Sequence, residues 1–448
     1  MTKKKKKIKL GSIYIFVNIV FILGCFIFYG YRLIHFYRLE HPKIEENTPL
    51  YELITLDKNI TTINEGLYKE DNVYRYIGNN LDNYVIYSGR LWRIVSAENN
   101  KVKLITEDPQ TSLVWSINTN YENSYVRSWL NDENNELKSF YESLSNTSYI
   151  VNTKTCIDVV AEESLKCEQV IEDKVGLLSA YEYQKAGGEE SYLNIGEYWW
   201  TSNIDKDNVA WYVYSKGSLN NTSYSGTTYY SYGVRPTITL NGDIEVIRGN
   251  GTKETPYLLD KTTENILNKK YVGEYLNYSG YTWRIIETDD EYVKIAMNGI
   301  VKNEEGEDLI TYFGKSNYYS VSQDVGKYLN TTFYNNLTKQ DYILEHDFNT
   351  GRYDKTYKYD FNKIAEYKEK AKVGLLQLGE LFITDIPKYF LATRTITSDN
   401  SIYEVLEEGR IYAGELTDEL GLRVTMYLKP DIAILSGEGT NESPYVIE

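Results

Sequence analysis

The stretch GVRPTITLNGDIEVIRGNGTKETPYLL, Gly233 to Leu259, decides the fold because a related stretch occurs again near the end of the chain. Its match is GLRVTMYLKPDIAILSGEGTNESPYVI, Gly421 to Ile447, which begins 188 residues later. A long segment that recurs with its apolar, glycine and proline positions kept indicates a duplicated structural unit. We therefore expect two related domains in one chain.

Two further blocks recur in the same order. YSGRLWRIV, Tyr87 to Val95, matches YSGYTWRII, Tyr278 to Ile286, and VGLL at 175–178 returns at 373–376. We therefore expect a first domain at 74–260, a linker at 261–269 and a second domain at 270–448. Residues 32–73 are expected to form a polar stalk.

Both copies have the pattern of a mainly stranded α+β domain. Apolar and polar residues alternate on both sides of a Ser-Gly pair, which predicts a β-hairpin around Trp92 and Trp283, and both rings are expected in the core. Apolar residues at helical spacing predict one helix within Ser124 to Leu144 and its counterpart within Val325 to Leu337. Short strands are expected after the VGLL blocks.

The N-terminus is expected to set the cellular location. Residues 1–9 form a basic tail, and Leu10 to Tyr31 are 22 residues without a charge, enough to cross a hydrocarbon layer of about 30 Å as a helix. Six lysines precede this stretch, which predicts a cytoplasmic N-terminus and extracellular domains on a single-pass membrane protein. A cleaved signal peptide is the alternative, but the stretch lacks a small-x-small cleavage site.

Composition excludes several classes of function. Residues 1–43 hold nine of the 48 basic residues and one of the 64 acids, so the remaining chain has 39 basic and 63 acidic residues, a net charge of −24. Phosphate backbones would repel such a body, and we expect no nucleic-acid partner. His346 is the one histidine beyond residue 41, so we expect no histidine-based metal site, no catalytic triad and no cofactor.

Three cysteines fit an oxidising compartment. Cys25 lies within the apolar stretch, whereas Cys156 and Cys167 would close a short loop. Outside the cytoplasm such a pair is expected to form a disulfide, with two free thiols as the alternative.

One segment carries a family resemblance. EYWWTSNIDKDNVAWYVYSKGSLNNTSYSGTTYYSYGVRP, Glu197 to Pro236, resembles the closing part of Fibrobacter-type paralogous domains and related bacterial surface modules of the C-type-lectin-like and formylglycine-generating-enzyme fold group. The resemblance implies two tandem C-type-lectin-like α+β domains with twisted antiparallel sheets, a few helices and long loops used for recognition. Formylglycine-generating enzymes hold copper with late cysteines, and this chain has none after Cys167, so that activity is not expected. The calcium and sugar motifs of C-type lectins are also missing from the sequence, and no metal site is expected.

Candidate ligand-binding residues lie in the turn-rich segment Leu219 to Tyr232, which the resemblance places near ligand-binding loops. Rigid tyrosine rings next to adaptable amides are typical of recognition surfaces. The alternative is an ordinary solvated hairpin. The candidates are Asn220, Asn221, Tyr224, Tyr229 and Tyr230.

Two arginines and two tryptophans are also candidates, but each is explained as well by a role in the fold. Arg235 and Arg423 follow a glycine in both copies and are expected to form internal ion pairs, with a clamp for a ligand carboxylate as the alternative. The adjacent Trp199 and Trp200 point to opposite faces of a strand, so one of them is a candidate for exposure.

The expected function is binding or adhesion at the bacterial surface, by a protein that is not an enzyme and has no catalytic residues. The ligand is a glycan, a peptide or a surface protein, the Leu10 to Tyr31 segment contacts the membrane, and the oligomeric state is left open. The alternatives are an enzyme acting on the cell envelope and a structural subunit of a membrane complex. A deep cleft with two acids, or a metal site, would favour the enzyme.

Overall fold

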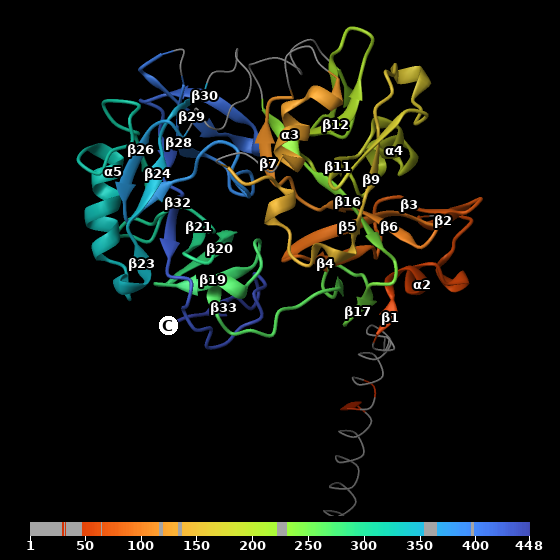
Figure 1. The fold of residues 1–448 in the computed structure, drawn as a ribbon. Coiled ribbons are helices and arrows are strands. Elements are labelled where there is room, and N and C mark those ends of the chain that lie inside the picture. Colours follow the sequence, from red (N-terminus) through yellow and green to blue (C-terminus); the bar gives the residue numbers. More distant parts are fainter. Residues whose placement is uncertain are drawn as a thin grey trace, which may run out of the picture.

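The structure, a computed structural model of the chain, describes residues 29–30, 32, 47–63, 65–115, 120–132, 137–221, 231–353, 365–395 and 398–448. Figure 1 shows two bodies rich in β-strands, the first coloured orange to green and the second teal to blue. We call residues 84–258 the first unit and residues 275–446 the second unit.

The first unit contains two main sheets and two short strand pairs, with additional strands from the N-terminal side. The nine-stranded sheet consists of β2 (Gly66–Glu70), β3 (Val73–Ile77), β4 (Tyr84–Tyr87), β5 (Arg90–Glu98), β6 (Lys101–Thr106), β8 (Ile150–Val151), β11 (Gly176–Leu177), β16 (Pro236–Asn241) and β18 (Tyr257–Leu258). The five-stranded sheet consists of β7 (Thr111–Leu113), β12 (Trp199–Ile204), β13 (Ala210–Val213), β14 (Leu219–Asn220) and β15 (Tyr232–Val234). The short pairs are β9 (Thr153–Cys156) with β10 (Val170–Asp173), and β1 (Thr48–Pro49) with β17 (Glu245–Val246).

The second unit has the same kinds of sheet. Its seven-stranded sheet consists of β19 (Tyr275–Tyr278), β20 (Tyr281–Thr288), β21 (Val293–Met297), β23 (Ile343–Leu344), β27 (Gly374–Leu375), β32 (Val424–Leu428) and β33 (Tyr445–Val446). Its six-stranded sheet consists of β22 (Ile310–Thr311), β25 (Arg352–Tyr353), β28 (Tyr389–Thr395), β29 (Ser401–Val405), β30 (Ile411–Glu415) and β31 (Leu420–Gly421). A short pair is formed by β24 (His346–Asn349) and β26 (Lys368–Ala371).

The strand pairings of the first unit recur in the second. In the first unit β5 lies antiparallel between β4 and β6, and β16 pairs with β6, β8 and β11. The second unit repeats both arrangements. There β20 lies antiparallel between β19 and β21, and β32 pairs with β21, β23 and β27. Each large sheet ends with a parallel pair, β18 with β4 and β33 with β19. Each smaller sheet contains a parallel pair as well, β12 with β15 and β28 with β31. Residue equivalences between the units follow directly from these pairings.

The two repeated hairpins are built in the same way. Both Ser-Gly turns have positive φ at both residues, the geometry of a two-residue turn that matches the twist of the flanking strands. The indole N–H of Trp92 donates to the carbonyl of Tyr87, and that of Trp283 donates to Tyr278, each at 2.9 Å. Both tryptophans are fully buried, which confirms the predicted core positions.

Of the helices predicted in the two copies, the first is shorter than expected and the second is present. Within the described part of Ser124–Leu144 the α-helix α3 (Tyr125–Asn131) ends before Asp132, which has extended backbone angles. The second expected helix consists of α5 (Asp324–Tyr328) and a π-helical turn at Leu329–Phe333. Within the described residues strands greatly outnumber helices, and α3 with seven residues is the longest α-helix.

The expected fold class, α+β with two tandem C-type-lectin-like domains after a transmembrane helix, is therefore wrong. The described chain is predominantly β. Among the described residues no helix has the length and apolar character needed to cross a membrane. Of the segment expected to span the membrane, Leu10 to Tyr31, only Tyr29 and Gly30 belong to the described residues.

Residues before the first unit add to its sheet. β3 pairs with β5, β2 pairs with β3, and β1 pairs with β17. The short helix α2 (Leu50–Ile54) buries Leu50 and Ile54 against the same unit. The remaining short helix, α4 (Ala180–Lys185), begins at Ser179 with a capping box closed by Glu182.

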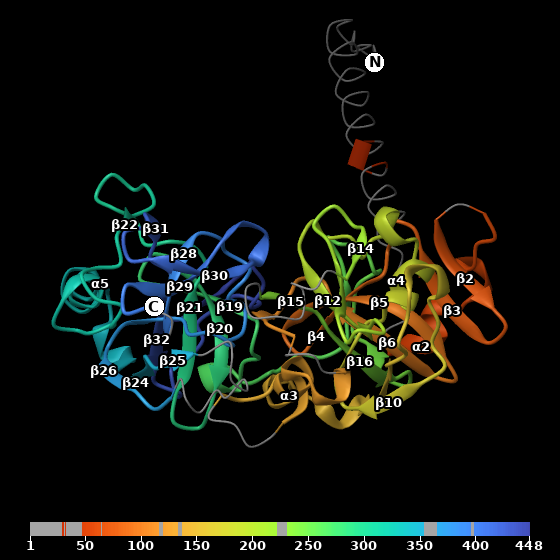
Figure 2. The same ribbon diagram turned by 90° about the horizontal axis from the view of Figure 1, so that it is seen from above.

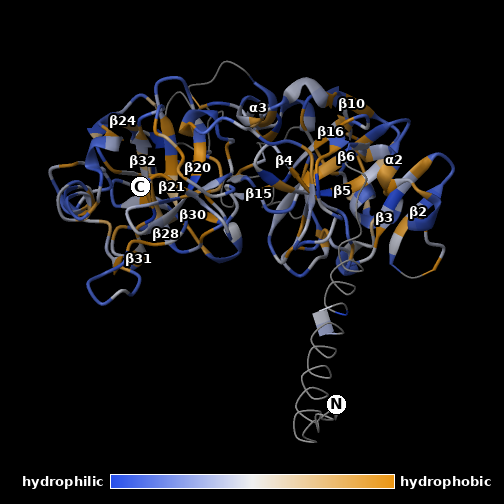
Figure 3. Ribbon diagram, turned by 90° about the horizontal axis from the view of Figure 1, so that it is seen from below, coloured by the Kyte–Doolittle hydropathy of each residue, from blue (hydrophilic) through white to orange (hydrophobic). Residues whose placement is uncertain are grey.

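The two units pack firmly together. Figure 2 shows them side by side from above, and in Figure 3 the apolar strands lie inside while polar segments face outward. The buried apolar side chains form one connected cluster that contains both Trp92 and Trp283. At the joint, Gly273 approaches so closely that a Cβ atom there would lie 2.5 Å from the carbonyl oxygen of Gly89. The described parts of residues 47–448 therefore form one packed body.

Candidate functional site

A polar cleft with a volume of about 520 Å³ opens on the first unit. Its size falls within the range of roughly 300–1,000 Å³ that is usual for small-ligand sites. Carboxylates, amides, cations and two tyrosines form its walls. The lining residues are Asn79, Asn80, Leu81, Asp82, Tyr84, Arg93, Glu107, Asp108, Tyr192, Asn194, Ile195, Lys253 and Glu254.

Arg93 of β5 organises the inner wall of the cleft. Its Nε donates to Asn83 Oδ1 at 2.6 Å, and its Nη1 lies 3.3 Å from Glu107 Oε2. The guanidinium also lies over the rings of Tyr84 and Tyr192, 3.8 Å and 4.7 Å from their centroids. Because these contacts use both the edge and the faces of the guanidinium, Arg93 is a rigid part of the wall.

Two neighbouring carboxylates follow β6 at the end of the cleft. Glu107 is paired with Arg93, whereas the carboxylate of Asp108 accepts no hydrogen bond from any described residue. The side chain of Asp108 is open to the cleft, but the surrounding protein displaces part of its water, and this desolvation together with the charge of Glu107 raises the pKa of Asp108. Asp108 is therefore a carboxylate that gains from a donor supplied by a ligand.

A second arginine lies behind the cleft without an acid partner. Arg235 is fully buried, and it donates to the carbonyls of Thr106 at 3.0 Å and Leu193 at 2.8 Å. Its guanidinium covers the ring of Trp199, and among the described residues its Nη2 has no hydrogen-bond partner. The internal ion pair predicted for Arg235 is therefore not formed with a described residue. Glu107 and Asp108 are among the charged groups that interact with it, so it contributes positive potential near both carboxylates.

The corresponding place in the second unit is closed. Arg284 and Arg423 are the counterparts of Arg93 and Arg235. The carboxylate of Asp385 bridges Arg284 and Arg423, because one oxygen lies 2.9 Å from Arg284 Nη1 and the other lies 2.7 Å from Arg423 Nη1. The matching positions of the first unit, Ile195 and Gly196, carry no acid. The ion pair predicted for Arg423 is thus confirmed.

Contacts with the first unit also help to close this place in the second unit. Segment 379–384 of the second unit lies on residues 109–111 of the first. Phe382 N donates to Gln110 O at 2.6 Å, and the hydroxyl of Thr384 donates to Pro109 O at 3.1 Å. The first cleft is therefore open, and its duplicate is filled at the joint.

A smaller cavity of about 140 Å³ lies between the units, lined by Leu137, Lys138 and Leu144 of the first and Ile286, Glu287 and Leu381 of the second, among others. Lys138 pairs across it with Glu287 at 3.2 Å. This cavity is too small for a ligand of more than a few atoms, and we regard the open cleft as the candidate site.

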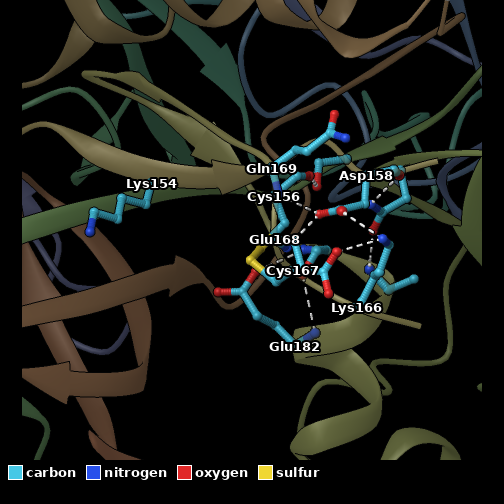
Figure 4. Close-up of a disulfide and its surroundings, with 12 residues drawn as sticks. Lys154, Cys156, Asp158, Lys166, Cys167, Glu168, Gln169 and Glu182 are labelled. Carbon is cyan, nitrogen blue, oxygen red and sulfur yellow. Dashed lines mark hydrogen bonds and ion pairs between the residues drawn. A yellow bond between two sulfur atoms is a disulfide. The ribbon is translucent and has the colours of Figure 1, made fainter. Parts of the chain in front are cut away.

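The predicted disulfide is present between Cys156 and Cys167 (Figure 4). It holds the loop after β9 against β10. Inside this loop the buried Asp158 accepts hydrogen bonds from the backbone N–H groups of Glu168 and Gln169, at 2.9 Å and 3.0 Å. The bond and the carboxylate together fix a loop that packs against β12, because Val160 N donates to Ile204 O.

The predicted ligand-binding residues are only partly described. Asn220 lies in the edge strand β14, and its amide donates to Ser218 Oγ. Asn221 follows that strand and donates to Asp205 Oδ2 at 3.0 Å. Tyr224, Tyr229 and Tyr230 lie outside the described residues. The structure therefore does not test whether the five lie together, and their role in binding stays a prediction.

Trp199 and Trp200 correct another expectation. Both are fully buried, so neither is exposed. Trp199 packs on Tyr183, and Trp200 on the opposite face donates to Leu113 O and packs on Trp115. Both faces of β12 are covered, which alternation along one strand does not reveal.

The residues of the cleft were missed as a set by sequence reasoning. The available signal lies in charge differences between the two copies: Glu107 is replaced by Asn298, and Asp385 has no acidic counterpart. A comparison of the two copies position by position would have found these differences in charge.

Fold and cleft together define a predominantly β protein with a duplicated unit, an open polar cleft in the first copy and a closed counterpart in the second. Residues 99–242 are similar to the family described as Domain of unknown function (DUF6273). The match runs from β6 to β16 and includes Glu107, Asp108 and Tyr192. No curated protein and no solved structure matches the chain. Thus no comparison links it to the Fibrobacter-type or C-type-lectin-like modules.

Proposed function

We propose that the chain is a ligand-binding protein of the cell surface, and that the cleft of the first unit is its binding site. One observation carries this proposal: the cleft is open in the first unit, while the equivalent place in the second unit is filled by Asp385 and packed on the first unit. Differential filling of duplicated sites is expected where one copy binds and the other supports it. The ligand is a glycan, a peptide or a protein segment.

A location outside the cytoplasm supports this function. The Cys156–Cys167 disulfide fits an oxidising space, and the lysine-rich N-terminus followed by 22 uncharged residues fits export and attachment to the membrane. Protease treatment of intact cells tests it: digestion of the body in intact cells supports an extracellular location, and protection until lysis contradicts it.

An enzyme of the cell envelope is the second candidate, because the cleft contains two adjacent acids, Glu107 and Asp108. The pairing of Glu107 with Arg93 favours binding, since that carboxylate is already committed to the wall of the site. Cleavage of a bound glycan or peptide, followed by chromatography, would favour the enzyme.

A binding screen tests the proposal. The full chain, kept in solution by a detergent without a sugar headgroup, is applied to arrays of glycans and cell-envelope fragments, together with Tyr229→Ala/Tyr230→Ala. Selective binding is expected. Binding that survives in the double variant shows that Tyr229 and Tyr230 are not needed and supports the cleft, whereas binding lost by the well-folded double variant moves the site to the late loop. Absence of binding by the folded protein would contradict the proposed function.

A further inference from the structure

The lining of the cleft has an excess of negative charge. It contains four carboxylates and two cations, so its net charge is −2. Arg93 and Glu107 neutralise each other at 3.3 Å, which leaves three carboxylates and the amine of Lys253 to meet a ligand. The three remaining carboxylates are Asp82, Asp108 and Glu254.

These three carboxylates lack protein donors. None of them accepts a hydrogen bond from a described residue, and an ionised carboxylate can only accept. Asp108 also bears the cost of lost hydration and of the nearby Glu107. A ligand that fills the cleft therefore has to supply several N–H or O–H donors, and positive charge on these donors is favoured.

Amides add a second requirement. Asn79 and Asn80 line the same cleft, and their side chains have no partner among the described residues. Each amide offers donors and an acceptor, the combination that pairs with hydroxyl groups. Hydroxyls alone would satisfy the amides, and amines alone would satisfy the carboxylates, so the lining as a whole fits a ligand that carries both.

We propose that the cleft binds glycans with free amino groups and prefers them to N-acetylated or carboxylated glycans of the same length. This inference rests on the proposed function and names the ligand class of the same cleft. N-acetylation removes the charge of the amine and one of its donors, and a carboxylated glycan faces like charges from Asp82, Asp108 and Glu254. A lining that contains few free cations offers such a glycan little compensation.

Titration calorimetry tests the ligand class directly. The full chain in a detergent without a sugar headgroup is titrated with glucosamine, N-acetylglucosamine and galacturonate tetrasaccharides at mildly acidic pH, where the sugar amines are protonated. We expect the glucosamine tetrasaccharide to bind about tenfold more tightly than the N-acetylated one, which corresponds to about 1.4 kcal/mol. The advantage should shrink with added salt, because it depends on charge.

A pair of matched variants locates the effect. Asp108→Asn should weaken the binding of the glucosamine tetrasaccharide and thereby abolish its preference over the N-acetylated one. Asp207→Asn, a change of the same kind on an exposed turn of the first unit, should alter neither. Thermal unfolding of both variants shows whether they are folded, and Glu254→Gln repeats the test if Asp108→Asn does not fold.

The outcomes separate this inference from the proposed function. Equal binding of the amino and N-acetylated glycans, or a preference for galacturonate, would overturn the ligand class and leave a glycan-binding protein. Binding of pentalysine as tightly as the glucosamine tetrasaccharide would overturn it too, because charge alone would then explain recognition. If no array ligand binds at all, the proposed function itself fails.

Discussion

Removal of the Asp385 side chain should be among the most damaging single changes in the second unit. Asp385 bridges Arg284 and Arg423, and the exposed fractions of the three side chains are 14%, 10% and 0%. Breaking a buried ion pair from one side costs about 3–5 kcal/mol, because a charge is left buried without a partner. Asp385→Ala leaves two such guanidiniums, so we expect a loss near the upper end of that range.

The assay is urea unfolding followed by circular dichroism, with the midpoint and the slope compared with the wild type. Asp399→Ala is the matched control, because Asp399 forms an exposed ion pair with Arg352. The side chains of Arg352 and Asp399 are 40% and 79% exposed, and an ion pair of this kind contributes about 0–1 kcal/mol to stability. A loss below about 1 kcal/mol for Asp385→Ala, equal to that of the control, would refute the reasoning. It would mean that water or another group replaces the carboxylate between the arginines.

Three further changes test other parts of the fold. Cys156→Ser/Cys167→Ser should lower the free energy of unfolding by about 3 kcal/mol, measured in urea, because it frees a short closed loop; no difference from the wild type would contradict this. Gly273→Ala should lower the melting temperature more than Gly280→Ala, since both have positive φ but only the first Cβ would meet backbone, that of Gly89; equal shifts would argue against a tight joint. Stability should fall as the pH rises from about 4 to about 7, because the folded protein holds protons that the unfolded chain has released, and a flat or rising profile of melting temperature against pH would contradict it. Burial raises to about 7 the pKa of each of the carboxyls responsible, Glu197, Asp260, Glu274 and Glu404.

Local features of the fold could be predicted from the sequence. The Ser-Gly turns require positive φ at two residues, and the alternating patterns on either side give the strands directly. Trp92 and Trp283 occupy buried faces of these strands, and their spacing from the turn lets each indole bond the strand before it. The Cys156–Cys167 disulfide was likewise predicted, from two cysteines close in sequence and an expected oxidising compartment.

Helix length and the cleft depend on contacts that a sequence pattern does not contain. The apolar spacing after Ser124 continued past Asp132, but the backbone there turns extended and the helix ends. The docking of segment 379–384 on Gln110, which closes the second site, joins residues about 270 positions apart. Trp200 is buried because Trp115 and Leu113 of distant segments cover its face.

The proposed binding site in the first unit is tested most directly by placing a bulky tryptophan in the cleft and, as a control, at the equivalent position of the second unit. Glu254 lines the cleft, and Glu442 holds the equivalent exposed position in the second unit, so Glu254→Trp and Glu442→Trp make matched variants. The dissociation constant of the best array ligand is measured for both. We predict that Glu254→Trp weakens binding at least about tenfold, or 1.4 kcal/mol, while Glu442→Trp leaves it unchanged. Equal affinity of the two folded variants, or a loss confined to Glu442→Trp, would contradict a ligand site in the first unit.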